Sequence, residues 1–283
     1  MSLNAIDLSR IPAPDALVVV DHAAKVAQMK AQLIAARPDL ATALDLPSEP
    51  LVKLVEVWAY EAILKAAEIN AGVRAMLLPL ATGADLDNIV ANLRVQRLPS
   101  ETDDALRQRA ALAPEGWATA GPYGAYLFHA RGASPKVADV AVSSPAAGQV
   151  RVVVLSTAAD GAADAALVAA VSDALNDEEV RPLTDAVTVV SAGVAPFDVV
   201  ANLKVPSGPD AGPVVAQAEA AVRKYAADRR RLNRGVPVNG VRAALMPAGV
   251  EDIELQAPVA DIPAHAEVAP VLRTVTLTVE VLP

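Results

Sequence analysis

Hydrophobic residues recur with a helical period over the first part of the chain. Asp21 and Ser48 are placed to cap two of the helices that this period predicts, and Pro38 and Pro79 are placed to end them. The predicted helices cover residues 22–36, 48–78, 82–94 and 102–113. Up to Trp117, therefore, the pattern predicts helices only.

After Trp117 the pattern shifts to short strands that alternate with helices. Ser144–Gly148 separates two valine-rich runs, which is typical of a β-hairpin, and Phe197–Val205 alternates between apolar and polar positions. Strands are predicted over 137–143, 149–155, 187–190, 197–205, 251–256 and 274–281. Helices are predicted over 122–130, over 163–175 with apolar residues at i, i+4 and i+8, and after Pro213 and Pro237. The expected orders are α–β–β–α–β and then β–α–α–β–β.

The expected fold class is α+β, with an N-terminal helical bundle segment that contains a long helix, followed by two small modules in which helices cover a sheet. Four parts are predicted. They are an N-terminal arm (1–20), a helical wedge or core-bundle domain (21–117), a first α+β module (118–195) and a second α+β module (196–283). The proline-bearing stretch 257–271 is expected to be a long functional or mobile loop.

The long predicted helix carries two apolar stripes. At about 100° per residue, one stripe predicted to face inward contains Leu51, Val55, Trp58, Ala62, Ala66, Ile69, Val73 and Leu77. The second stripe, Val57, Tyr60 and Leu64, lies among charged residues. It is covered either by another helix of the same chain or by a partner chain. Because burying it inside a small head would also bury unpaired charges, we take these three residues as a candidate partner interface.

Composition narrows the classes of function. The net charge of −9 argues against a general nucleic-acid binder, and the absence of cysteine excludes disulfides, thiolate zinc sites, iron–sulfur clusters and a cysteine nucleophile. The three histidines lie far apart in sequence and suggest no metal site. No stretch is apolar for long enough to span a membrane, and the charged start does not resemble a signal peptide. We therefore expect a soluble, cytoplasmic protein with no catalytic, metal or cofactor site.

Three short motifs have both a structural and a functional interpretation. Gly83–Asn88 superficially resembles a calcium loop, but it lacks the alternating ligand spacing, and we favour a helix start. Arg229–Arg231 with Arg234 ends a helix, which we favour over a phosphate site. The glycine-rich stretch at the start of the 122–130 helix lacks the lysine of a phosphate loop. We expect a hinge there, at Gly116, Gly121, Pro122 and Gly124, with a partner-docking loop as the alternative.

Four segments together resemble the baseplate J-like proteins of contractile phage tails, including those of Mu-like and P-two-like phages. They are Ala81–Asp87, Ala113–Tyr126, Ser143–Val150 and Leu175–Asp185. The similarity runs in order from about residue 40 to the end of the chain.

This resemblance implies a structural wedge protein without an active site or cofactor, located in the virion tail baseplate or a related phage-like particle and assembled in the host cytoplasm. The implied partners are a second copy of the chain, another baseplate wedge protein, the sheath-initiator protein and the tail hub or spike complex, without nucleic acid or membrane. The ring of wedges is expected to rearrange when the sheath contracts. The alternatives are a soluble adaptor or scaffold outside a tail, and a hydrolase that uses carboxylates.

Overall fold

The computed structural model describes residues 8, 11–12, 14–118, 121–207 and 211–282. Of the predicted arm 1–20, residues 1–7, 9–10 and 13 therefore lie outside the described residues. The chain divides into two compact units, each with its own packing. The first comprises 1–97 and 102–111, and the second comprises 98–101 and 112–283. The four-part division predicted from the sequence remains a prediction.

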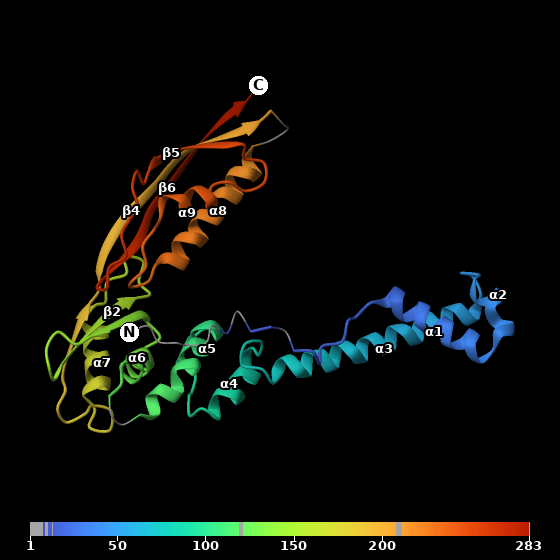
Figure 1. Cartoon of the computed structure of the whole chain (residues 1–283), viewed down its shortest axis with the longest axis horizontal. Coiled ribbons are helices and arrows are strands. Elements are labelled where there is room, and N and C mark those ends of the chain that lie inside the picture. The colour runs from blue at the N-terminus through green and yellow to red at the C-terminus, as the bar shows by residue number, and fades with distance from the viewer. Residues whose placement is uncertain (1–7, 9–10, 13, 119–120, 208–210, 283) are drawn as a thin grey trace. The chain divides into compact units, whose positions relative to one another are not determined.

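The first unit is built from helices (Figure 1). Asp21 caps the first of them as predicted, since its side chain accepts a hydrogen bond from Ala24 N. The elements are α1 (His22–Ala36), the 3₁₀ turn η2 (Pro38–Leu40), α2 (Ala41–Leu44), α3 (Pro50–Ala75), α4 (Gly83–Ala91) and α5 (Asp103–Leu112). The chain between Pro38 and Ser48, for which no helix is predicted, thus forms η2 and α2.

Several predicted helix boundaries are wrong. Glu49, not Ser48, is the N-cap of α3, and Ser48 precedes the cap. The helix ends at Ala75 rather than Leu78, because Pro79 has no N–H to donate to Ala75 O and its ring crowds that carbonyl. Similarly, α4 ends at Ala91, three residues before Arg94, which adopts a positive φ of 57°.

The second unit contains a first sheet whose central strand pairs antiparallel with the preceding strand and parallel with the following one. The strand order is β1-β2-β3. The elements are the 3₁₀ turn η3 (Ala113–Trp117), α6 (Tyr123–Gly132), β1 (Val137–Ser143), β2 (Gln149–Ser156), α7 (Ala165–Asn176) and β3 (Ala186–Ser191). The hairpin predicted at Ser144–Gly148 is confirmed, since it joins the antiparallel pair β1 and β2.

Strand β2 and helix α7 each contribute several buried side chains to this part, beside those of α6 and β1. Those of β2 are Val152, Val153, Val154 and Leu155, and those of α7 are Leu167, Val171 and Leu175. The three from α7 recur at i, i+4 and i+8, as the sequence pattern predicts. The buried stripe of α7 is therefore specified by the sequence.

A second sheet follows in the order β5-β4-β6, again with one antiparallel and one parallel neighbour for its central strand. The elements are β4 (Gly193–Pro206), α8 (Gly212–Arg229), α9 (Val238–Ala244), β5 (Asp252–Ala257) and β6 (Val268–Leu282). The predicted alternation in β4 is confirmed, since every second side chain from Phe197 to Val205 is buried. These side chains pack against α8 and α9, which cover one face of the sheet (Figure 1).

The predicted long loop over 257–271 is shorter than expected. β6 begins at Val268, because residues 268–271 pair with the start of β4. Within the remaining connection, Ile262 forms an isolated β-bridge with Val236. The element orders and the α+β class predicted from the sequence are confirmed. In the described part of the chain, no helix combines the length and the apolar character needed to cross a membrane.

Candidate functional site

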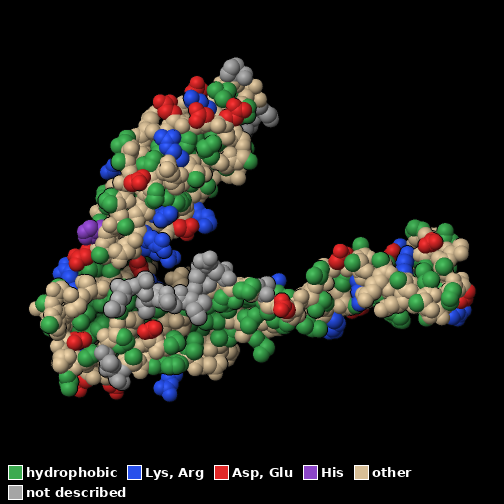
Figure 2. Space-filling view, viewed as in Figure 1, with side chains coloured by type: hydrophobic (Ala, Val, Ile, Leu, Met, Phe, Trp, Pro, Cys, Tyr) green, Lys and Arg blue, Asp and Glu red, His purple; other side chains and the backbone are tan. Residues whose placement is uncertain are grey.

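The candidate interface residues Val57, Tyr60 and Leu64 lie on an uncovered face of α3. Their exposed fractions are 57%, 55% and 39%. They are spaced i, i+3 and i+7, so they share one side of the helix. Figure 2 shows hydrophobic side chains distributed along this part of the molecule among charged ones. The structure therefore brings the three residues together, and their role in binding stays a prediction.

The opposite side of α3 is covered by the chain itself. Val52, Val55 and Ala59 are its buried residues, and α1 packs beside the helix. Further along, the Asn70 side chain donates to Val18 O and accepts from Val18 N, both at 2.8 Å. The segment before α1 is thereby attached to α3.

The predicted inward stripe is wrong at two positions. Trp58 and Ile69 are 59% and 57% exposed, whereas the adjacent Ala59 is buried and Asn70 binds the segment around Val18. A small side chain allows close approach, and an amide satisfies the backbone of that segment. Hydrophobicity alone favours Trp58 and Ile69 as the buried residues, so the sequence pattern places the inward stripe on the wrong residues at these two points. With Leu54, which is 48% exposed, Trp58 and Ile69 add exposed apolar surface that sequence reasoning missed.

Charged side chains on the uncovered side of α3 pair with one another in water. Lys53 lies 3.0 Å from Glu56, and Lys65 lies 2.7 Å from Glu68, both at i, i+3. Exposed pairs of this kind contribute little to stability, about 0–1 kcal/mol. They leave narrow apolar stripes between hydrated charges, an arrangement that a single partner helix can cover without burying the ions.

The residues of the predicted hinge lie where η3 packs on α6. A Cβ at Gly116 would collide with the Phe128 ring, and one at Gly124 would lie 2.6 Å from the Glu115 side chain. Both glycines therefore permit close packing.

The other two hinge residues set the backbone before α6. Gly121 has a positive φ of 64°, which favours glycine. Pro122 is the N-cap of α6, whereas the sequence pattern predicts it as the first helical residue. The difference is one residue at a helix boundary. Hinge motion at these positions stays a prediction.

Three of the sequence segments that carry the resemblance meet in this part of the structure. Tyr126 in α6 donates a 2.6 Å hydrogen bond to Asp185, which precedes β3. Gly148 O accepts from Ala186 N, and a Cβ at Gly121 would lie 2.5 Å from Pro182. Burial and the bond to Asp185 raise the pKa of the Tyr126 phenol. Residues far apart in sequence thus fix one loop.

The segment that resembles a calcium loop is the start of α4. Asp103 accepts a 3.0 Å hydrogen bond from Gly83 N and pairs with Arg97, and both contacts lower the pKa of its carboxyl. Arg97 also pairs with Asp87 at 2.7 Å. The carboxylates are thus held by an arginine and by backbone, as the helix-start interpretation favours. Sequence reasoning missed Asp103, because it belongs to the next helix.

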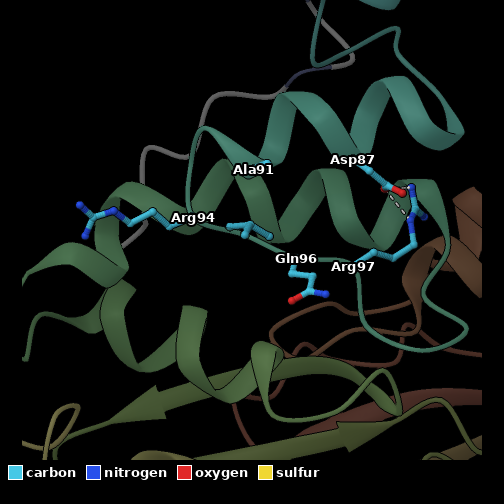
Figure 3. Close-up of a pocket in the computed structure, with 6 residues that line it drawn as sticks. Asp87, Ala91, Arg94, Gln96 and Arg97 are labelled. Atoms are coloured by element: carbon cyan, nitrogen blue, oxygen red, sulfur yellow. Dashed lines mark hydrogen bonds and ion pairs between the residues drawn. The ribbon is translucent and has the colours of Figure 1, made fainter.

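A shallow recess of about 540 Å³ lies beside this ion pair. Figure 3 shows Arg94 at one end of it and the Asp87–Arg97 pair at the other. Its lining consists of Asp87, Ala91, Arg94, Val95, Gln96 and Arg97. Asp87 and Asp103 balance the charge of Arg97, so Arg94 carries the unbalanced positive charge of this lining, and Ala91 is its exposed apolar residue.

The remaining chemical candidates have structural partners. Arg230 donates to Ser156 O at 3.1 Å and to Ala158 O, and Arg229 lies over the Tyr225 ring. Among the described residues, no three histidine, aspartate or glutamate side chains are grouped so as to hold a metal ion. The arginine cluster therefore has structural contacts, as the helix-end interpretation favours.

Comparison with known proteins gives consistent matches along the chain. Residues 47–104 match the baseplate J-like N-terminal domain, and residues 118–191 match the baseplate J-like central domain. Baseplate protein J of Escherichia phage P2 is 39% identical over 277 residues, which cover 91% of this chain and 92% of that relative.

Proposed function

The chain belongs to the baseplate J-like family, and from this premise we propose that it is a wedge protein in the baseplate of a contractile phage tail. Its role there is structural. Copies of the chain form a ring around the tail hub, and the ring rearranges when the sheath contracts. Its partners are a second copy, another wedge protein, the sheath initiator and the hub or spike complex.

The uncovered face of α3 carries this proposal. Val57, Tyr60 and Leu64 expose apolar surface on a helix whose other side is already packed. Contiguous exposed apolar surface of this kind marks interaction sites. We assign this stripe to a helix of another wedge protein, because such a helix can cover it while the flanking lysine–glutamate pairs stay hydrated.

The arrangement of carboxylates supports a structural role over hydrolysis. Asp139 pairs with Arg131, and Asp198 pairs with Arg273. Asp185 accepts a hydrogen bond from Tyr126. Each of these groups stabilises a local contact, whereas a hydrolase needs carboxylates that converge on a substrate.

Substitution of Leu64 tests the proposed contact. Burying Leu64 at an interface contributes about 1.5–3 kcal/mol, so Leu64→Asp is expected to weaken binding of the wedge partner about tenfold to a hundredfold or more. Leu64 is exposed in the isolated chain, so the melting temperature of the isolated Leu64→Asp variant should hardly differ from that of the wild type. Binding is measured by pull-down with the proteins encoded by neighbouring tail genes.

Val55→Asp provides the matched control, since Val55 is 2% exposed on the covered side of the same helix. This variant should lose stability, because it buries a carboxylate without a partner. If Leu64→Asp lowers the melting temperature as much as Val55→Asp, or leaves partner binding intact, the proposed interface is wrong.

A further inference from the structure

Leu183 is fully exposed in a turn that the structure holds in place. Its exposed fraction is 100%. Asp185 N donates to Pro182 O at 3.1 Å, which closes the turn around Leu183. Asp185 is attached to Tyr126, and Pro182 lies against Gly121. A large apolar side chain is therefore presented to solvent from a fixed backbone.

Acidic side chains precede this turn. The segment 177–185 contains four carboxylates and one arginine. Glu178 and Glu179 are exposed, and Arg181 donates to the Asn176 side chain. The surface around Leu183 is thus apolar at its tip and negative beside it. Its complement is a hollow with an apolar residue in its lining and an unpaired positive charge beside it.

The recess beside α4 has this character. Of its two apolar lining residues, Ala91 is exposed and Val95 is 4% exposed, and the volume of about 540 Å³ accommodates a leucine side chain. Arg94 is exposed, and its guanidinium has no hydrogen bond or ion pair with any residue that the structure describes. Arg97, in contrast, is engaged by Asp87 and Asp103. The Arg94 side chain is therefore the basic group available to an incoming acidic segment.

We propose that Leu183 of one copy inserts into the Ala91–Val95 recess of a second copy, with Glu178 or Glu179 beside Arg94. The two surfaces differ, so the contact is heterologous, and repeated contacts of this type close a ring or continue as a filament. The proposal rests on the ring proposed above and names a contact within it.

A single such contact is weak. Complete burial of one leucine increases affinity by about tenfold to a hundredfold, and a shallow recess gives less, so isolated chains should associate only transiently. In a baseplate, other contacts hold the copies near one another and raise the effective concentration of the two surfaces.

Cysteine cross-linking detects a transient contact, and the chain contains no cysteine of its own. Thr184→Cys places a thiol beside Leu183, and Gln96→Cys places one in the recess. Under oxidising conditions, mixed full-length variants should form a disulfide-linked heterodimer several times faster than Thr184→Cys mixed with Ala31→Cys. Ala31 is an exposed control position on α1. Adding Leu183→Asp to the Thr184→Cys chain should remove the difference.

Equal cross-linking to Gln96→Cys and to the control would overturn the proposal. A variant that carries both cysteines in one chain gives a second test. If its disulfide forms only within that chain at low protein concentration, the proposal is also overturned. Leu183→Asp should fold, because Leu183 is fully exposed, and its melting temperature verifies this.

Charge exchange provides a second readout. Arg94→Glu should slow cross-linking, and Glu178→Arg with Glu179→Arg in the other chain should restore it. Failure of rescue would overturn the pairing of these charges. The pull-down with Leu64→Asp is independent of this contact. If the recess contact fails while that pull-down succeeds, the contact is wrong and the wedge role stands.

Discussion

At the scale of residues, small and polar side chains decide where elements approach. Gly116 and Gly124 leave no space for a Cβ between η3 and α6. Tyr126, which is 3% exposed, fixes the loop before β3 through its bond to Asp185. These residues contribute little to a hydrophobic pattern, yet each selects one packing arrangement.

Tyr126→Phe is predicted to lower the free energy of unfolding by about 1.5–3 kcal/mol, the usual range for a hydrogen bond to a charged group. Thermal melting at pH 7 measures this loss. Tyr123→Phe is the control, because no side-chain bond of Tyr123 is seen among the described residues, and it should change little.

The same bond predicts a dependence on pH. The folded state raises the pKa of Tyr126 above its ordinary value of 10.0, so its contribution is complete below pH 10 and is lost as the pH rises further. Wild-type stability should therefore fall more steeply than that of Tyr126→Phe above pH 10. Parallel curves for the two proteins in alkaline melts would contradict this.

At the scale of elements, the described residues cover α3 on one side. α1 packs beside α3, and Asn70, in the second half of α3, binds the segment around Val18. A segment held by few bonds opens locally at low cost. The uncovered side is left for the proposed partner.

Asn70→Ala is predicted to release this segment without unfolding α3. Losing two hydrogen bonds should increase protease cleavage between residues 14 and 20 by about tenfold, since cleavage follows the population of the open form. Limited proteolysis with mass spectrometry locates the cut. Asn92→Ala, which removes a bond to Asn88 O, is the control. Unchanged cleavage in Asn70→Ala would show that other contacts hold the segment.

At the scale of the whole molecule, the two sheets of the second unit share a buried cluster. Leu232 and Ala269 pack with Ala141, Val153 and Leu155 from the first sheet. Polar contacts add to this cluster, namely the Arg151–Glu267 pair at 2.9 Å and the bond from Leu232 N to Asp139. We expect the two sheets to unfold together.

Leu232→Ala is predicted to uncouple them. In native-state hydrogen exchange, peptides from β1–β3 and from β4–β6 should share one opening free energy in the wild type and differ in this variant. Leu245→Ala removes a fully buried leucine from the second sheet's own core and should cost about 2–5 kcal/mol while leaving the coupling intact. If peptides from the two sheets share one opening free energy in Leu232→Ala as well as in Leu245→Ala, the role of Leu232 is contradicted.

Much of the fold was predictable because it depends on local periodicity. The range of α1 and its Asp21 cap, the 144–148 hairpin and the alternation in β4 are each specified within a few residues. The same is true of the α+β class. The three candidate interface residues could also be identified as a separate stripe, since charges around them argue against burial within the chain.

Only the tertiary structure decided the rest, because it depends on which surfaces meet. Periodicity places a stripe on α3 but cannot show that Ala59 and Asn70 contact the chain while Trp58 and Ile69 face solvent. Nor can it bring Tyr126 to Asp185, or leave Leu183 exposed in a closed turn. The sequence determined the elements through short-range propensity, whereas close contacts between distant residues determined which of their faces remain free.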